Sequence, residues 1–476
     1  MKTTENGDNT RDIFQNTSDY FNRIKNNVAA LRQFFTAMPK GGDLHNHLTG
    51  SAYAETYFEL AVKHGMYVDM ETGKLYKEQP EGIEVIQLSK KMDDLHNHRM
   101  TLIDKWSIRN FQPYKYPLGP DEYFFGTFGL LSALTKDINN LAVLVHELKV
   151  RASKENVQYL EVMGMSPDIP AKCFLFDKYD EFDRELKGMV KKGDYRNVKS
   201  TLKEILVYFD NNAESNVADY LQSYTDLEKL SNQYFDKLQN WEPINVTMCY
   251  QGYASRGGDP LKVFAQLYVV HKACMLGKGN LLVGCNIVAA EDGENSMLYY
   301  RLHMEMFAVL AEKFPDVPSS LHAGELAIGL MRPEHMGYHV TQAIEIAKAK
   351  RIGHGVDIPF EWNSNYTMYM MRERGGAIEI NLTSNEFILG VKDTEHPIRL
   401  YYEAGIPVII STDDPGILRT SLTEQYVLAV LRYGFSYEEI RRFVYNSINY
   451  SFLSELEITS QLNILDGLFR KFESTF

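Results

Sequence analysis

The strongest constraint on the fold is a regular alternation of short apolar runs with longer segments of helical periodicity. A short apolar run bounded by turn residues is typical of a buried strand, and strands separated by helices form parallel sheets. Eight such runs occur, at residues 43–47, 157–162, 245–250, 281–288, 377–381 and 407–411 and in the segments ending at His322 and His354. The pattern predicts an α/β fold, a (β/α)8 TIM barrel, with its chemistry at the carboxyl ends of the strands.

The chain is longer than the barrel requires, and we expect one domain over residues 1–476 with three additions. These are an N-terminal helical extension over 1–37, lid helices with a small hairpin over 52–156, and a helical insertion over 166–242. Apolar residues recur every three or four positions from Tyr20 to Phe35, which predicts a single helix ended by Pro39. The 166–242 insertion carries no catalytic pattern, so a structural or interface role is expected.

Two features mark the 52–156 segment. Alternating residues around Glu71-Thr72-Gly73 predict a hairpin over 66–76. Phe124 and Phe128 lie at helical spacing with their apolar neighbours. Core packing is the favoured interpretation of such a stripe. The alternative is a lid over a planar ligand, with both rings as candidate substrate contacts.

Charge and cysteine content exclude several classes of partner. The net charge of −13 argues against nucleic acid, because phosphate binding uses clustered lysine and arginine. The four cysteines form no C-x-x-C pair, which favours free thiols in a reducing compartment. Neither a signal peptide nor a membrane span is predicted, since no sufficiently long apolar run occurs. We expect a cytoplasmic protein, with secretion as the alternative if a signal peptide was removed.

Four residues that can bind a metal stand at the ends of predicted strands: His45, His47, His322 and Asp413. Taken singly, a strand-end histidine is more often structural, and an Asp-Asp-Pro segment is more often a solvated turn. In a barrel, however, the carboxyl ends meet at one rim, and His45 and His47 face the same side of their strand. Three imidazoles and a carboxylate suit one zinc ion per chain, although iron, cobalt and manganese accept the same ligand types.

Three residues beside these ligands are candidates for proton transfer: Glu325, His354 and Asp414. A bound divalent ion lowers the pKa of a water ligand from about 15.7 towards about 7, which creates a nucleophile at neutral pH. Glu325 follows His322 closely and is placed to protonate the acceptor. His354 and Asp414 would orient the nucleophile, accept its proton or stabilise charge. A loop histidine hydrogen-bonded to backbone is the alternative for His354.

The motifs as a set resemble the adenosine and AMP deaminase family of metal-dependent hydrolases, from residue 38 to about residue 416. The similar segments are MPKGGDLHNHLTGS, VQYLEVMGMSP, SLHAGE, RIGHGVDI, EINLTSN and STDDP. VGCNIVAAEDG and EINLTSNEFILGVKDTEHPIRL are most similar to the secreted adenosine deaminase growth factor branch. The resemblance implies that His45, His47, His322 and Asp413 bind zinc, and it also implies roles for three neighbouring residues. Glu325 would protonate purine N1, His354 would position and deprotonate the water, and Asp414 would orient the nucleophile and contact N7.

The chain departs from the resembled family at three positions near the substrate. Thr49 replaces the carboxylate expected near the ribose 5′ end, and Leu48 stands where the growth factor branch has an acid. The family has the motif Asp-Leu-Ala-Gly where this chain has Asn286-Ile287-Val288-Ala289. Ala289 therefore replaces a glycine whose amide contacts purine N3 in the family. These changes bear on specificity for the ribose side and leave the deamination chemistry intact.

The sequence therefore predicts zinc-dependent hydrolytic deamination of a 6-aminopurine nucleoside, adenosine or 2′-deoxyadenosine. Deamination of a 5′-modified adenosine, adenine or AMP, or another hydrolysis at the same metal centre, stays open because a barrel hosts many chemistries. A nucleoside-binding signalling module is the alternative from another class. The expected partners are a small purine nucleoside and, from the growth factor likeness and the insertions, a second copy in a homodimer.

Overall fold

All eight predicted strands are present, and they form two parallel sheets. The structure is a computed structural model that describes residues 5–169, 177–236, 244–277 and 281–476. The first sheet has the order β1-β5-β6-β7, with β1 (Gly42–His47), β5 (Tyr159–Met163), β6 (Thr247–Ser255) and β7 (Leu282–Val288). The second has the order β11-β10-β9-β8, with β8 (Ser320–Ala323), β9 (Arg351–His354), β10 (Ala377–Ile380) and β11 (Val408–Ile410).

Isolated bridges join the two sheets at both seams. At one seam Asn46 pairs with Asp413, and the Asp413 amide donates to the His45 carbonyl at 2.8 Å. At the other, Cys285 pairs with Ser319, and the Cys285 amide donates to the Pro318 carbonyl at 3.1 Å. The described residues thus show two four-stranded parallel sheets in contact at their edges, and no continuous eight-stranded ladder.

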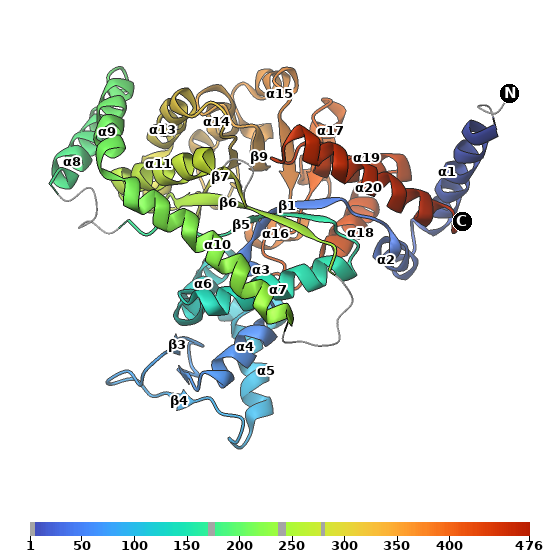
Figure 1. Cartoon of the computed structure of the whole chain (residues 1–476), viewed down its shortest axis with the longest axis horizontal. Helices are drawn as coiled ribbons and strands as arrows, with labels where there is room; N and C mark the ends of the chain where they lie inside the picture. The colour runs from blue at the N-terminus through green and yellow to red at the C-terminus, as the bar shows by residue number, and fades with distance from the viewer. Residues whose placement is uncertain (1–4, 170–176, 237–243, 278–280) are drawn as a thin grey trace.

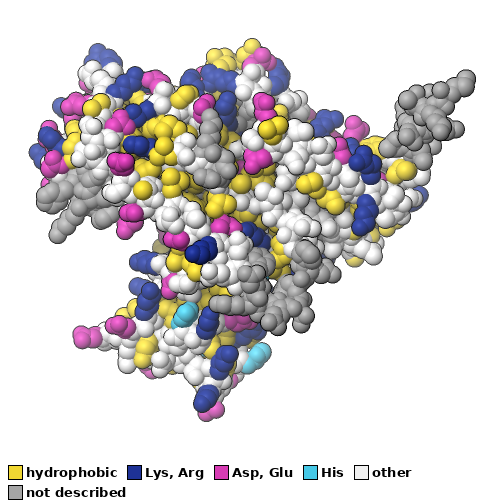
Figure 2. Space-filling model, viewed as in Figure 1, with side chains coloured by type: hydrophobic (Ala, Val, Ile, Leu, Met, Phe, Trp, Pro, Cys, Tyr) yellow, Lys and Arg dark blue, Asp and Glu magenta, His cyan; other side chains and the backbone are white. Residues whose placement is uncertain are grey.

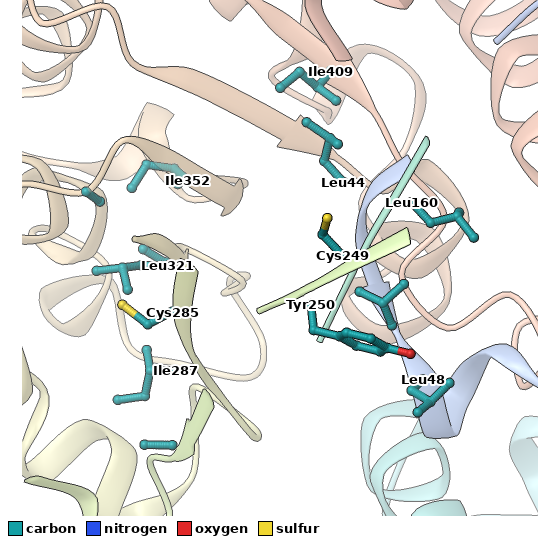
Figure 3. Packing of buried hydrophobic residues seen from close by; sticks show 14 of the residues in the cluster. Leu44, Leu48, Leu160, Cys249, Tyr250, Cys285, Ile287, Leu321, Ile352 and Ile409 are labelled. Carbon is teal, nitrogen blue, oxygen red and sulfur yellow. The ribbon is translucent and has the colours of Figure 1, made fainter. Parts of the chain in front are cut away.

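Apolar side chains from strands of both sheets fill the space between the strands and the helices. Leu44, Leu160, Leu321, Ile352 and Ile409 come from five strands and are almost fully buried (Figure 3). Each such side chain contributes about 1.5–3 kcal/mol by leaving water. The helices around the strands are α7 (Ile138–Lys154), α11 (Pro260–Leu276), α12 (Glu294–Leu298), α13 (Tyr300–Lys313), α14 (His339–Glu345), α15 (Ser364–Glu373), α16 (Leu382–Leu389), α17 (Ile398–Glu403), α18 (Leu422–Tyr433) and α19 (Tyr437–Asn449).

The segment after β1 forms a lobe that projects away from the parallel strands (Figure 1). The predicted hairpin is confirmed, because β2 (Tyr67–Val68) pairs antiparallel with β3 (Leu75–Tyr76). A third strand, β4 (Ile86–Gln87), which the alternation did not predict, pairs with the other side of β2. The lobe also contains the helices α3 (Leu48–Ser51), α4 (Ala54–Lys63), α5 (Leu95–Lys105) and α6 (Pro120–Thr135).

The 166–242 segment is helical in its described part, as its periodicity predicts. It contains α8 (Tyr179–Lys192), α9 (Val198–Asn212) and α10 (Glu214–Asp236). Cys173 lies outside the described residues, while Cys249, Cys274 and Cys285 are buried free thiols. Lysine, arginine and acidic side chains alternate over the face shown in Figure 2, with no continuous basic patch there.

The prediction of a single helix from Tyr20 to Phe35 is wrong. The chain forms α1 (Glu5–Ile24) and α2 (Val28–Ala37), and the break allows Asn27 to cap α2 by accepting from the Ala30 amide at 3.1 Å. The break lets aromatic rings of both helices pack against the C-terminal part of the chain, as in the Phe34–Phe472 pair with centroids 5.1 Å apart. That C-terminal part is α20 (Glu455–Glu473), which begins with a capping box at Ser454.

The search for membrane-spanning helices gives one weak candidate. Within the described ranges no single helix has the length and apolarity to cross a bilayer, and only the sharply bent pair α6 and α7 passes that test jointly.

Candidate metal centre and catalytic site

The four predicted metal ligands converge at the carboxyl ends of β1 and β8 and just beyond β11. One potential ligand atom from each of His45, His47, His322 and Asp413 lies within 4.8 Å of all the others. Asp413 Oδ1 is 3.4 Å from His45 Nε2 and 3.3 Å from His47 Nε2, and His47 Nε2 is 3.2 Å from His322 Nε2. Segments far apart in sequence therefore present three ring nitrogens and a carboxylate to one point.

The hydrogen bonds on the far side of the rings fit a metal at this point. His45 Nδ1 donates to Glu379 Oε2 at 2.7 Å, and His322 Nδ1 lies 3.0 Å from Asn286 Oδ1. Each Nδ1 proton is thus engaged outwards, which leaves each Nε2 lone pair directed at the shared space. His45 Nε2 is buried and has no hydrogen-bond partner among the described residues. A nitrogen and oxygen donor set without thiolate suits a divalent transition metal.

The ionisation of the ligands is consistent with cation binding. Burial, and then the neighbouring His45 and His47, lower the pKa of His322 well below its usual value, so the ring is a neutral ligand. Burial alone would raise the pKa of Asp413, but hydrogen bonds from His45 and His47 hold it well below its usual value. The centre therefore presents the Asp413 carboxylate beside the neutral His322 ring. Burial alone would lower the pKa of His45, but hydrogen bonds to Asp413 and Glu379 raise it to about 10, so a cation binds there by displacing the second His45 proton.

A buried network supports two of the ligands from below, and its members were not predicted from the sequence. Arg351 donates to both Glu379 and Glu161. Gln251 donates to Glu161 Oε1 at 2.9 Å and accepts from Asn286 at 3.1 Å, so the branches from His45 and His322 meet at Glu161. The signal that was available is a single carboxylate inside an otherwise apolar strand, as in β5 and β10, because such a residue is rarely buried without a partner.

Glu325 lies directly after β8 on a tightly held turn. Both oxygens of buried Glu291 accept from this turn, at 3.0 Å from the Gly324 amide and 2.9 Å from the Glu325 amide. Gly324 has φ +76°, and a Cβ there would meet Asp357 Oδ1 at 2.2 Å, so the turn requires glycine. Burial, with the negative charges of Asp413 and Glu291, raises the pKa of Glu325 well above its usual value. The carboxyl is thus protonated at neutral pH and can donate a proton.

His354 also reaches the centre, and Asp414 directly follows the ligand Asp413 in the chain. His354 Nδ1 is 3.5 Å from Glu325 Oε1, and Asp414 is buried, with Oδ1 unpartnered in the described part of the chain. Both His354, at φ 67°, and Asp413, at φ 64°, adopt left-handed backbone that costs a side-chain-bearing residue about 1–3 kcal/mol. Such strain at the ends of β9 and β11 is typical of a functional site.

The other residues predicted to contact the substrate lie in different parts of the structure. Thr49 lies on α3, where its carbonyl accepts from the Tyr57 hydroxyl at 2.6 Å. Ala289 is exposed just beyond β7 at φ 87°, a backbone conformation that favours the glycine it replaces. Phe124 is buried on α6 in a small apolar cluster, and the partly buried Phe128 packs against that cluster. The favoured interpretation of core packing therefore holds for Phe124.

Two cavities of similar size flank the parallel strands. One, of about 600 Å³, is lined by Leu282 and Ser319 near the amino ends of β7 and β8, away from the metal ligands. The other, of about 570 Å³, borders α16 and the loop after Glu325. Its lining is largely apolar, and its charged members, Glu386 and Lys392, are paired at 3.1 Å.

The parallel sheets, the strand-end histidines and the protonated carboxyl beside them define a metal-dependent hydrolase of mixed α/β fold. The sequence model of the family named adenosine deaminase matches residues 265–469. An adenosine deaminase of Clostridium perfringens (strain SM101 / Type A) is 24% identical over 425 residues, which are 89% of this chain and 96% of the relative. These comparisons support an aminohydrolase of the adenosine/AMP deaminase family.

Solved structures share the fold at low identity. The N6-mAMP deaminase of Arabidopsis has a TM-score of 0.57 at 20% identity, covering 91% of this chain and 99% of its own. A cog1816 amidohydrolase from Burkhoderia ambifaria with bound Zn has a TM-score of 0.57 at 16% identity, covering 93% and 94%. The family is metal-dependent, and the His/Asp cluster of this chain is a potential metal site, so both observations support metal binding.

Proposed function

We propose that this chain hydrolyses the 6-amino group of a purine nucleoside, adenosine or 2′-deoxyadenosine, to give the 6-oxopurine nucleoside and ammonia. The observation that carries the proposal is the convergence of three imidazoles and Asp413 beside a protonated Glu325. We further propose that one zinc ion occupies the four-ligand site and that the eight strands act as one (β/α)8 barrel closed through the two seams.

The residues divide the reaction between them. When bound, the metal would supply Lewis acidity and acidify a water molecule for attack at purine C6. Glu325 would donate its proton to ring nitrogen N1 as the bond to C6 forms, since its raised pKa keeps that proton at neutral pH. His354 and Asp414 flank the same point, where one holds the attacking oxygen and the other accepts its proton. Ammonia leaves with that proton.

A nucleoside is favoured over a nucleotide if the 5′ end of the substrate enters the largely apolar cavity beside α16 and the loop after Glu325, whose lining includes none of the metal ligands. A 5′-phosphate there would meet Lys392, whose charge Glu386 already neutralises. Phosphate recognition in proteins uses arginine, lysine or a helix amino terminus. AMP or an N6-methylated AMP is the second candidate, because the structurally similar Arabidopsis protein is an N6-mAMP deaminase.

A substrate panel tests this proposal. Zinc-loaded protein is incubated with adenosine, 2′-deoxyadenosine, adenine, AMP, N6-methyl-AMP and 5′-methylthioadenosine, and released ammonia or methylamine is measured. We expect the highest kcat/KM for an unphosphorylated nucleoside. A preference for AMP would move the assignment to the nucleotide, and no turnover of any compound would overturn it in favour of a nucleoside-binding module. The homodimer and the cytoplasmic location stay predictions.

A further inference from the structure

A cavity of about 600 Å³ lies at the amino ends of β7 and β8, whereas the metal ligands lie at the carboxyl ends of the strands and just beyond β11. Its walls come from α11, α13, the two strand ends and the segment that follows α19. The volume is within the range of about 300–1,000 Å³ that is usual for small-molecule sites. None of the described residues that line it belongs to the metal centre or to the groups proposed for catalysis. The cavity is therefore a candidate binding site separate from the catalytic one.

Most of the cavity wall is apolar. Met275, Phe307 and Phe452 contribute thioether and aromatic surface. His271 also lines the cavity, but burial lowers the pKa of its ring to about 4, and its Nδ1 donates to the Leu267 carbonyl at 2.7 Å. The ring is therefore neutral and its proton is already engaged. Such a wall favours a ligand with an apolar body, because apolar surface is buried when the two meet.

Two polar groups of the lining are free to meet a ligand. The side chains of Lys350 and Ser319 make no hydrogen bond or ion pair with any described residue. The two residues are neighbours at the amino ends of adjacent strands, because the Lys350 amide donates to the Ser319 carbonyl at 2.9 Å. Ser319 is only 7% exposed, and buried hydroxyls are ordinarily hydrogen-bonded. This hydroxyl therefore needs a partner inside the cavity, from a ligand or from solvent.

The other charged members of the lining already have partners. Lys348 Nζ donates to a backbone carbonyl, Glu457 accepts from a backbone amide at 2.9 Å, and Asp316 also interacts with another residue. Within the described lining, Lys350 is thus the one cation left for a ligand, and no carboxylate lacks a partner. The charge of the cavity favours an anion.

We propose that this cavity binds a small organic acid, with its apolar body against Phe307 and Phe452 and its carboxylate at Lys350 and Ser319, and that its occupancy is coupled to the metal centre. An ammonium group and a hydroxyl both donate hydrogen bonds to a carboxylate. This inference goes beyond the proposed deamination and does not depend on it, since it concerns the binding of an acid and of a metal.

Phe452 connects the cavity with the network that supports the metal ligands. Its ring packs on the Arg351 guanidinium, whose central carbon lies 3.7 Å from the ring centroid, and its amide donates to Glu161 Oε2 at 2.9 Å. Arg351 donates to both Glu161 and Glu379, and Glu379 accepts from His45 Nδ1 at 2.7 Å. Three direct contacts therefore lead from the cavity wall to a metal ligand.

The close packing of Phe452 determines the sign of the coupling. A Cβ at Gly284 would lie 2.5 Å from Phe452 Cδ2, so β7 leaves the ring little room on that side. A ligand body in the cavity would confine the ring further and hold it against Arg351. The guanidinium would then stay in the position that orients Glu379 towards His45. Acid and metal should therefore each strengthen the binding of the other.

Calorimetric titration of the zinc-loaded protein with 3-phenylpropionate and octanoate tests the site, and 3-phenylpropanamide is the uncharged counterpart. We expect one acid to bind per chain and the amide to bind at least about 10-fold more weakly, since a hydrogen bond to a charged group contributes that factor or more. Tighter binding of one acid assigns the body of the ligand as aromatic or aliphatic. Equal binding of acid and amide, or no binding of either acid at millimolar concentration, would overturn the proposal.

Two substitutions show whether the acid occupies the cavity or the metal centre itself. Ala311→Phe places a ring in the cavity and Lys350→Gln removes the cation, so each should weaken binding of the acid by at least about 10-fold. Ala30→Phe on α2 and Lys262→Gln on α11 are the matched controls outside the cavity, and they should leave binding unchanged. Lys350 is exposed, so its substitution tests the site even if Ala311→Phe does not fold. Undiminished binding to both cavity variants would place the acid elsewhere and overturn the site.

Chelator competition with and without saturating 3-phenylpropionate measures the coupling. We expect zinc to bind at least about 5-fold more tightly when the acid is present, and the acid to bind the metal-free protein more weakly by the same factor. Phe452→Leu keeps an apolar wall but loses the contact between ring and guanidinium, so it should bind the acid and lose the coupling. Phe307→Leu, the same change on α13, is the control and should keep it.

Two outcomes would contradict this coupling. A zinc affinity of the wild-type protein that the acid does not change would overturn it. Full coupling in Phe452→Leu would overturn the route through Phe452 and Arg351. Neither measurement uses turnover, so both stand whether or not the enzyme deaminates a purine.

Discussion

His45 donates its Nδ1 proton to Glu379 Oε2 at 2.7 Å, and both side chains are fully buried. The carboxylate belongs to β10 and the imidazole to β1, so two strands of different sheets fix the orientation of one ligand. Arg351 and His45 lower the pKa of Glu379 to about 2 although burial alone would raise it, so the partner of His45 stays ionised.

Glu379→Gln is expected to weaken metal binding by about 10- to 100-fold, because the amide presents less charge to the His45 proton and leaves Arg351 with one carboxylate. Competition with a chromogenic chelator measures the affinity. Glu228→Gln is the matched control. It breaks the Lys149–Glu228 ion pair, which has an N–O distance of 2.7 Å and lies away from the metal site, and it should leave the affinity unchanged. Equal affinities of Glu379→Gln and wild type would refute the orienting role.

Glu325→Gln is expected to abolish turnover while leaving the metal bound. Glutamine has a similar shape but no transferable proton, and general acid catalysis is worth about 10²–10⁴-fold. Wild-type kcat should fall as pH rises through the raised pKa of Glu325, since the donor form is lost. Single-turnover rates and bound metal per chain are the measurements, and a variant with near wild-type kcat would remove Glu325 from the mechanism.

Glu291 is expected to make the metal-free protein sensitive to acid. Burial alone would raise the pKa of Glu291, but His339 and Arg256 lower it from 4.5 to about 2. The unfolded chain therefore binds the proton first, so this contribution is complete above about pH 4.5 and is lost as pH falls towards 2. A shift of this size corresponds to about 3 kcal/mol.

Urea unfolding of the EDTA-treated protein between pH 6 and pH 2.5 should show this loss, and Glu291→Gln should flatten the profile. Replacement of the exposed Glu294 by glutamine is the control and should keep the wild-type slope. Parallel profiles for Glu291→Gln and wild type would show that the acid sensitivity arises elsewhere.

Gly50→Ala is expected to displace Asp414, because a Cβ at Gly50 would lie 1.5 Å from Asp414 Oδ1. Misplacing a reacting group by about 1 Å costs about 10²-fold in rate, so kcat/KM should fall by that order. Gly126→Ala on α6 is the control, since a Cβ there meets nothing within 4 Å. Activity of Gly50→Ala at the wild-type level would contradict a catalytic placement of Asp414.

The strands and the metal-binding residues could be predicted because both leave local signals. The runs ending at His322 and His354 are short, apolar and bounded by glycine. A histidine at the end of several such runs in one chain is unlikely to arise by chance. The break at Asn27 was missed because the apolar spacing continues across it, and the choice between one helix and two depends on what the aromatic rings pack against.

What the sequence alone determined is the set of eight strands and the chemical types present at their carboxyl ends. Only the tertiary structure decided that Glu161 joins the supports of two ligands. The physical reason is that strand and helix periods are local properties of the chain. A hydrogen bond between buried side chains depends instead on the relative position of segments that are distant in sequence.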